Sequence, residues 1–422
     1  MPCGRESKWD VLLLCVAGYI LTVVGRVHQL FPAVQLLRPA VLTGLLAIAL
    51  YLFDRREERR TRYLGGRPTV YVLALLAWMM LCVPAALVTG NSFDLVFDNF
   101  IKTVLMYVII AGSARGVRDV ERLLLAYLAS AAVYATVIVA RFDLGSGDAW
   151  RLAHLYYYDA NDFATFAVSA MPFAVYLLHT ARGVLSRAAA VFALAMLVLA
   201  FVYTGSRGGF IALLVMCGYI LLLYTGIPIR WRVFATALLI ALVAATASDR
   251  YWQQMSTIVS DADYNRTEET GRLQIWRRGV GYMLGNPLFG VGPGNFQSAE
   301  GRLSVQARRR ELGIGVRWNA AHNTYVQIGA EAGLPGLMLF VAIIVAAFRA
   351  LRRAAANSRR VAGSSRDGVL LTQALGAALA GLLTGAFFLS LAYSEMLYTL
   401  VALSAALYKV TRAEFPRAQY AR

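Results

Sequence analysis

Long apolar blocks alternate with short polar segments along the whole chain, and this pattern predicts an all-α, polytopic membrane protein. Several blocks have the length that a helix needs to cross a hydrocarbon core of about 30 Å. We predict about twelve transmembrane helices, and short runs among them need tilt or extension to complete the crossing. They lie near residues 9–25, 40–53, 69–89, 100–114, 123–140, 163–179, 188–203, 209–224, 233–247, 323–348, 368–389 and 393–410.

Lysine and arginine are distributed unevenly between the two sets of connecting segments, and this bias predicts the orientation. With the N-terminus inside, the inner segments hold twenty-five of these residues, whereas the short outer loops hold five. The basic runs at 54–62 and 349–353 lie on the inner side. Because basic loops stay in the cytoplasm, both termini are predicted to be cytoplasmic.

One connection, residues 248–321, is far longer than the others, and the order of the spans places it outside. It holds ten arginines, but long loops are translocated regardless of charge. Its stretch 271–284 has helical apolar spacing, which suggests amphipathic helices. The chain thus divides into spans one to nine (1–247), a large periplasmic loop with amphipathic helices (248–321) and spans ten to twelve (322–422).

Composition narrows the class of protein. Apolar residues make up 59% of the 422 residues and the mean hydropathy is +0.57, which excludes an ordinary soluble protein. The net charge of +17 would suit nucleic acid, but the charges lie in short loops between apolar segments. We therefore expect contact with membrane lipids and no nucleic-acid partner.

No pattern in the sequence indicates a metal or a cofactor. Three of the four cysteines lie inside apolar runs, which is unlike a metal cluster or a disulfide framework. The pair Asp261 and Asp263 matches a metal-binding D-x-D sequence, but chance explains so short a match. Nucleotide-binding motifs are absent from the sequence, so any group transfer has to draw its energy from the donor.

Charged residues at the outer ends of the spans are the candidates for function, because charge is costly at that depth. Most of them are cations, and cations facing outward favour an anionic substrate such as a lipid-linked diphosphate. The set consists of Lys102, Arg141, Arg151, His154, Arg207, Arg272, His322 and Glu395.

Arg207 lies in the sequence TGSRGGF (204–210), between the seventh and eighth predicted spans. Ser206 can cap the next helix, and Gly208 and Gly209 allow a ligand to approach the backbone. The helix start and the arginine suit a phosphate or a carboxylate, although a tight turn whose arginine reaches lipid headgroups is an alternative. Lys102, one turn into the fourth span, could likewise bind an anion or extend to the membrane surface.

His322 precedes Asn323 where the long loop returns to the membrane, at a predicted helix start. A helix N-terminus disfavours the imidazolium form, so we expect this histidine to be neutral and able to accept a proton. An interfacial histidine without a chemical role is the alternative.

These stretches together resemble the O-antigen ligase family, which also contains O-antigen polymerases and protein O-oligosaccharyltransferases. The order and spacing of the motifs carry the resemblance, together with the large outer loop between the second and the third. The motifs are TGSRGGFIAL (204–213), GRLQIWRRGVGYMLGNPLFGVGPGNF (271–296) and HNTYVQIGAEAGLPG (322–336), with a looser match in DANDFATF (159–166).

The resemblance implies a GT-C-like glycosyltransferase of the bacterial inner membrane with its active site facing the periplasm. Such an enzyme transfers O-antigen from undecaprenyl diphosphate to a hydroxyl of lipid A–core, with inversion and without metal or ATP. By motif position, Arg207 and Arg272 would bind the diphosphate and stabilise its charge, and His322 would be the general base. Weaker matches give Lys102, Arg141 and Arg151 as further diphosphate-binding residues. Apart from the resemblance, Glu331 and Glu395 are lesser candidates for the base, and Asn323 and His154 are lesser candidates for the site.

Two other functions stay open. A polymerase of the same family would extend the glycan on undecaprenyl diphosphate, and the motifs do not separate it cleanly from a ligase. A transporter or flippase would bind the same carrier without breaking a bond, but its charges are expected near the bilayer midplane rather than at one face.

Overall fold

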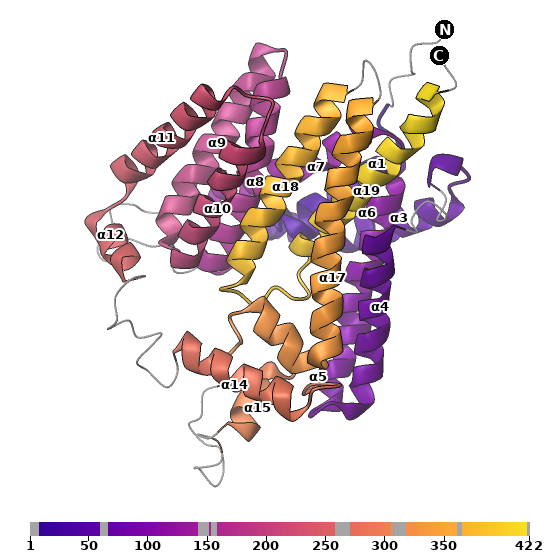
Figure 1. Ribbon diagram of the computed structural model, residues 1–422, viewed down its shortest axis with the longest axis vertical. Coiled ribbons are helices and arrows are strands. Elements are labelled where there is room, and N and C mark those ends of the chain that lie inside the picture. Colours follow the sequence, from indigo (N-terminus) through magenta and orange to yellow (C-terminus); the bar gives the residue numbers. More distant parts are fainter. Residues whose placement is uncertain are drawn as a thin grey trace.

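The structure is a computed structural model that describes residues 8–59, 66–141, 152, 158–257, 271–304, 307, 318–360 and 365–419. All the secondary structure in these residues is helical, which confirms the all-α prediction. Most of the helices lie side by side in a bundle (Figure 1). The start of α1 and the last turns of α19 lie at one end of it, and α14 and α15 lie at the other.

The long helices, with the bounds that the structure gives them, make up the bundle. They are α1 (Val11–Tyr19), α3 (Pro39–Phe53), α4 (Arg67–Cys82), α6 (Ile101–Ser113), α7 (Val117–Arg141), α8 (Ala160–Thr180), α9 (Val184–Thr204), α10 (Arg207–Leu223), α11 (Ile229–Thr246), α17 (Thr324–Arg360), α18 (Ser365–Ala386) and α19 (Glu395–Gln419).

Shorter helices connect these or lie at the ends of the bundle. They are η1 (Ile20–Val24), η2 (Val27–Leu30), α2 (Pro32–Gln35), η3 (Glu57–Arg59), η5 (Val83–Ala85), α5 (Thr89–Phe93), η6 (Asp94–Phe100), α12 (Asp249–Ser256), α14 (Arg272–Gly285) and α15 (Phe296–Leu303).

Within the described residues, nine helices are long and apolar enough to cross a membrane, and two shorter apolar helices cover Val11–Val24 and Arg207–Leu223. The multi-pass prediction is therefore confirmed, while the count of twelve and the orientation stay predictions. The helices differ in the share of their residues that is buried inside the bundle. In the most apolar part of α18, 89% of the residues are buried, against 6% in α11. In a bilayer the exposed apolar side chains of α11 face lipid, which places α11 at the edge of the bundle (Figure 1).

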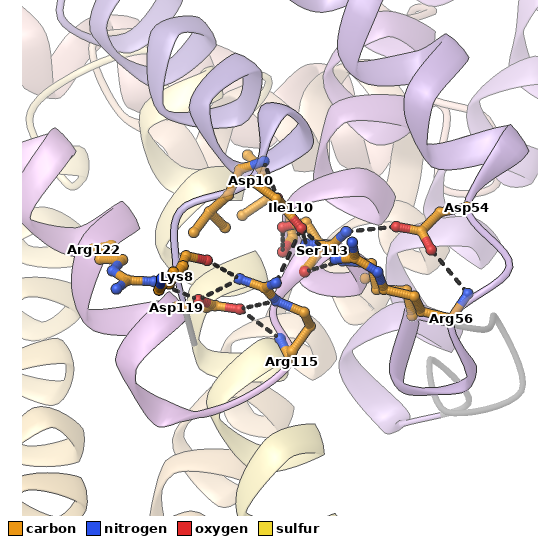
Figure 2. A network of polar contacts seen from close by, with 12 residues as sticks. Lys8, Asp10, Asp54, Arg56, Ile110, Ser113, Arg115, Asp119 and Arg122 are labelled. Atoms are coloured by element: carbon orange, nitrogen blue, oxygen red, sulfur yellow. Dashed lines mark hydrogen bonds and ion pairs between the residues drawn. The ribbon is translucent and has the colours of Figure 1, made fainter. Parts of the chain in front are cut away.

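A network of ion pairs closes the end of the bundle that holds the start of α1 (Figure 2). Arg59 is its centre: the side chain is 2% exposed and binds Asp10 and Asp54. Its Nε also donates to the carbonyl oxygen of Ser113 at 2.7 Å, at the end of α6. A second arginine, Arg115, joins Asp10 to the fully buried Asp119 of α7. The network thus ties α1, α3, α6 and α7 together.

We predict that Arg59→Ala destabilises the protein by about 3 kcal/mol, because it leaves two largely buried carboxylates without their shared cation. Thermal unfolding of the purified protein in detergent measures the effect. The exposed neighbour Arg55 provides the control, since Arg55→Ala removes the same charge outside the network. Equal midpoints for the two variants would contradict the structural role of Arg59.

Candidate functional site

His322 lies just before α17 in a backbone conformation that side chains rarely adopt. Its φ is +44°, in the left-handed region, which costs a non-glycine residue about 1–2 kcal/mol. Three hydrogen bonds hold this turn. The backbone N–H of His322 donates to Ser390 Oγ at 3.0 Å, and Asn323 Oδ1 accepts from the N–H groups of Tyr325 and Val326 at 2.9 and 3.0 Å. The surroundings therefore fix the position of the histidine.

Helix α14 reaches the same turn through Trp276. The indole Nε1 donates to the carbonyl oxygen of Ala321 at 3.0 Å. The indole ring also packs edge-on against Phe387, with ring centroids 5.3 Å apart, and lies 6.4 Å from Phe388. Because Arg272 begins α14 one turn before Trp276, these contacts hold Arg272 on the side of the molecule where His322 lies.

Helix α10 packs against the same aromatic residues. Ser206 caps the helix as predicted, and its Oγ accepts from the N–H of Gly209 at 3.1 Å. A Cβ on Gly208 would lie 2.9 Å from the Cβ of Phe388, and one on Gly209 would lie 2.7 Å from the Cβ of Ala164. Protein side chains therefore fill the Cβ side of these glycines and let α10 pack closely, which gives the glycines a structural reason that the sequence did not suggest.

The α18–α19 loop, defined here as residues 387–394, thus connects the three predicted residues. Gly208, next to Arg207, packs on Phe388, Trp276 of α14 packs on the same aromatic pair, and Ser390 binds the backbone of His322. Arg207 itself donates to Thr257 Oγ1 at 2.7 Å, which links it to the end of α12. Residues from three distant parts of the sequence therefore gather around the α18–α19 loop, at the end of α18 that is remote from the ion-pair network (Figure 1).

Electrostatics favour a neutral His322. Burial lowers the pKa of the imidazole, and the nearby positive charge of Arg272 lowers it further, while Asp159 acts in the opposite direction. The sequence attributes the expected neutrality to the start of the helix. In the structure the main cause is desolvation, which outweighs the effect of the charges. Asp159 was not among the predicted site residues, although it opens the loosely matching tract 159–166. It caps α8 by accepting from the N–H groups of Asn161 and Asp162 at 2.7 Å each.

The glycine-rich segment 286–296 fixes α14 against α17. The N–H of Val291 donates to the carbonyl oxygen of Ala330 at 2.8 Å, and that of Leu334 donates to the carbonyl oxygen of Pro287 at 2.8 Å. Gly290 and Gly333 both have positive φ, and a Cβ on either would collide with backbone atoms of the other segment. This close backbone contact explains the glycines of the motif, and it sets the position of α14 relative to the turn at His322.

Glu331 and Asn323, both lesser candidates, are engaged within the protein. Glu331 is 2% exposed, accepts from the N–H of Phe296 at 3.0 Å and binds the hydroxyl of Tyr393 at 2.6 Å. Asn323 is also 2% exposed and uses its side-chain oxygen as the cap of α17. Both residues support the site from within the protein.

The remaining candidates make other contacts or fall outside the described residues. Lys102 pairs with Asp98 at 2.6 Å, and the two side chains are 65% and 71% exposed. Arg141 donates to the carbonyl oxygen of Leu30 at 3.2 Å, and Glu395 begins α19 after the α18–α19 loop. The predictions for Arg151 and His154, and the pair Asp261 and Asp263, fall outside the described residues. No group of three or more His, Cys, Asp or Glu side chains in the described ranges could hold a metal ion.

These contacts define a multi-pass helical membrane protein in which Arg207, Arg272 and His322 lie at helix starts around the α18–α19 loop. The family model described as O-antigen ligase matches residues 189–341, a segment that includes Arg207, Arg272 and His322. Over this segment the match confirms the resemblance to the O-antigen ligase family that the motifs indicate. The family covers O-antigen ligases and related polymerases. No curated protein matches the chain.

We predict that Gly208→Ala destabilises the protein by about 1–3 kcal/mol, because the added methyl group overpacks the contact with Phe388. Gly218→Ala, on the same helix, is the matched control, since a methyl group at Gly218 would meet no neighbouring element within 4 Å. Thermal midpoints in detergent measure both variants. A Gly208→Ala midpoint at or above that of Gly218→Ala would show that α10 does not depend on this contact.

Proposed function

We propose that the chain is an O-antigen ligase, which transfers O-antigen polysaccharide from undecaprenyl diphosphate to a sugar hydroxyl of lipid A–core. The proposal places the site at the periplasmic face of the bacterial inner membrane and uses no metal or ATP. The observation that carries it is the gathering of Arg207, Arg272 and His322 around the α18–α19 loop, within the segment that matches the family.

In this mechanism the arginines stabilise the leaving group. The bond between the anomeric carbon and the diphosphate oxygen breaks, and its electron pair leaves as negative charge on the diphosphate. Arg207 and Arg272 bind that charge with guanidinium groups, whose planar geometry suits phosphate. The stabilisation grows as the charge develops, which is the condition for faster chemistry rather than tighter substrate binding alone.

His322 removes the proton from the attacking hydroxyl in the same scheme. A neutral imidazole is required for this step, and both burial and Arg272 keep the pKa of His322 below its ordinary value. The hydroxyl oxygen forms the new glycosidic bond from the face opposite the diphosphate, so the configuration inverts. Asp159 is close enough to interact with the imidazolium that forms, and we assign it a stabilising role.

The family also contains polymerases, so the same residues could extend a glycan on undecaprenyl diphosphate. The ligase is favoured by one dominant outer loop before the H-N motif, in residues 248–321. A flippase without bond cleavage is disfavoured by the sequence pattern, because its charges are expected near the bilayer midplane rather than gathered at one face.

Deletion of the gene separates the three functions, and we expect the ligase phenotype. Loss of a ligase leaves full-length polymer on the carrier and unsubstituted core. Loss of a polymerase leaves core with a single repeat unit, and loss of a flippase leaves repeat units on the cytoplasmic side. Electrophoresis of lipopolysaccharide and analysis of the lipid-linked pool measure these products. Core carrying one repeat unit would overturn the ligase proposal.

Restoring the deleted strain with His322→Ala should give a rate about 10²–10⁴-fold below wild type, the usual contribution of a general base. Activity is expected to persist at that level because the arginines still bind the leaving group. His179, near the end of α8 that is remote from the site, provides the control, and His179→Ala should support the wild-type rate. Attachment at the wild-type rate by His322→Ala would remove His322 from the mechanism.

The pH profile should report the charge of Arg272. Activity requires neutral His322 and therefore falls as the pH drops through its lowered pKa. Arg272→Gln removes a positive charge that lowers this pKa, so the acid limb of the profile should move to higher pH. The profile is measured with purified enzyme as kcat/KM against pH, and Arg277→Gln, an exposed change on the same helix, is the control. An acid limb that stays in place in Arg272→Gln would contradict the coupling.

A further inference from the structure

A groove lies between α4 and α17. It has a volume of about 450 Å³. Its wall on α17 is apolar and consists of Leu337, Met338, Val341, Ala342, Val345 and Ala346. Met338 is 65% exposed and Val341 is 43% exposed, so this wall is open to the surroundings of the bundle, which in a membrane are lipid chains.

The groove has a basic end. Arg67 and Arg349 line it together with Tyr71, and both arginines are exposed. Arg67 is the first residue of α4, and Arg349 lies one turn beyond Val345 on α17. Both therefore lie toward the end of the bundle that holds the ion-pair network. Neither side chain forms a hydrogen bond or an ion pair with the part of the chain that the structure describes, whereas Arg59 and Arg115 at that end are bound to carboxylates.

The dimensions fit one leaflet. From Leu337 to Arg349, α17 rises about 18 Å, at 1.5 Å per residue. Half of a hydrocarbon core of roughly 30 Å is about 15 Å. The groove thus has the length of a single acyl chain, and its two arginines lie at the depth of a phosphate headgroup. Beyond the apolar wall, Trp78 of α4 donates to the carbonyl oxygen of Ala332 at 2.9 Å and joins the two helices.

We propose that this groove binds an anionic glycerophospholipid from the leaflet on the side of the ion-pair network. One acyl chain lies along the apolar wall of α17, and Arg67 and Arg349 bind the phosphate. Under the orientation proposed above, this leaflet is the cytoplasmic one, which is rich in anionic lipid. The undecaprenyl donor is a different ligand, because Arg67 and Arg349 lie toward the ion-pair network, whereas the proposed diphosphate site lies at the starts of α10 and α14.

Lipid binding to the purified full-length protein in detergent tests the proposal, with native mass spectrometry as the readout. Titration with phosphatidylglycerol should give a specific bound lipid, and phosphatidylcholine should bind more weakly. In the double variant Arg67→Gln, Arg349→Gln, the affinity for phosphatidylglycerol should fall about thirtyfold, at roughly fivefold per arginine near an anionic headgroup. Arg353→Gln, an exposed change one turn further along α17, should leave it unchanged.

A second variant separates the groove from a general effect of charge. Ala342→Phe fills the apolar wall while it keeps both arginines, so it should also weaken phosphatidylglycerol binding. Three results would overturn the proposal: wild-type affinity in the double variant, equal loss in Arg353→Gln, or wild-type affinity in Ala342→Phe. Elution volume and thermal midpoint show that each variant is folded, and activity at the His322 site is measured separately, so failure here leaves the proposed ligase function untouched.

Discussion

The α18–α19 loop holds the His322 end of the molecule in one arrangement, because three helices that are distant in sequence depend on it. Phe388 packs against the start of α10, and Phe387 and Phe388 pack against Trp276 of α14. Ser390 accepts a hydrogen bond from the backbone N–H of His322, just before α17. A single hydrogen bond contributes about 1 kcal/mol, which is no more than the cost of the left-handed conformation at His322. The hydrogen bonds at Ala321 and Asn323 add to it, so the turn is stable only when all the neighbouring elements are in place.

The two ends of the bundle use arginine in different ways, and α14 shows both uses on one helix. Arg278 forms two hydrogen bonds to Glu300, whose side chain is 1% exposed, and thereby ties α14 to α15. Arg272, at the start of the same helix, is only half-buried and acts electrostatically on His322. The pair of Arg278 with Glu300 fixes the helix, as Arg59 fixes the other end of the bundle, and it thereby helps to set the position of Arg272 at the start of α14.

Features set by neighbours in sequence could be predicted, and features set by distant neighbours could not. The apolar length of each run predicts the helices, and the cap on α10 follows from Ser206 standing three residues before Gly209. The contact of Gly208 with Phe388 joins positions 180 residues apart. The sequence alone therefore suggested that the glycine makes room for a ligand. Arg59 illustrates the same limit. Its run of basic residues predicts a cytoplasmic loop, but its burial between Asp10, Asp54 and Ser113 depends on the packing of four helices. Asp159 carried a local signal, since an aspartate before a helix is a typical cap, but its proximity to His322 is tertiary.

The caps also indicate which helix start best suits an anion in the proposed ligase. Ser206 takes an N–H group of α10, Asn323 takes two of α17, and Asp159 takes two of α8. These groups are already satisfied, and Asp159 adds a negative charge at the start of α8. Helix α14 begins differently, because its N-cap is Gly271, which offers no side chain to its first N–H groups. A diphosphate beside Arg272 would therefore meet the positive end of α14 together with a guanidinium, whereas at α10 it would depend mainly on Arg207. In the proposed ligase, the charge that develops on the leaving group is then best stabilised at the start of α14.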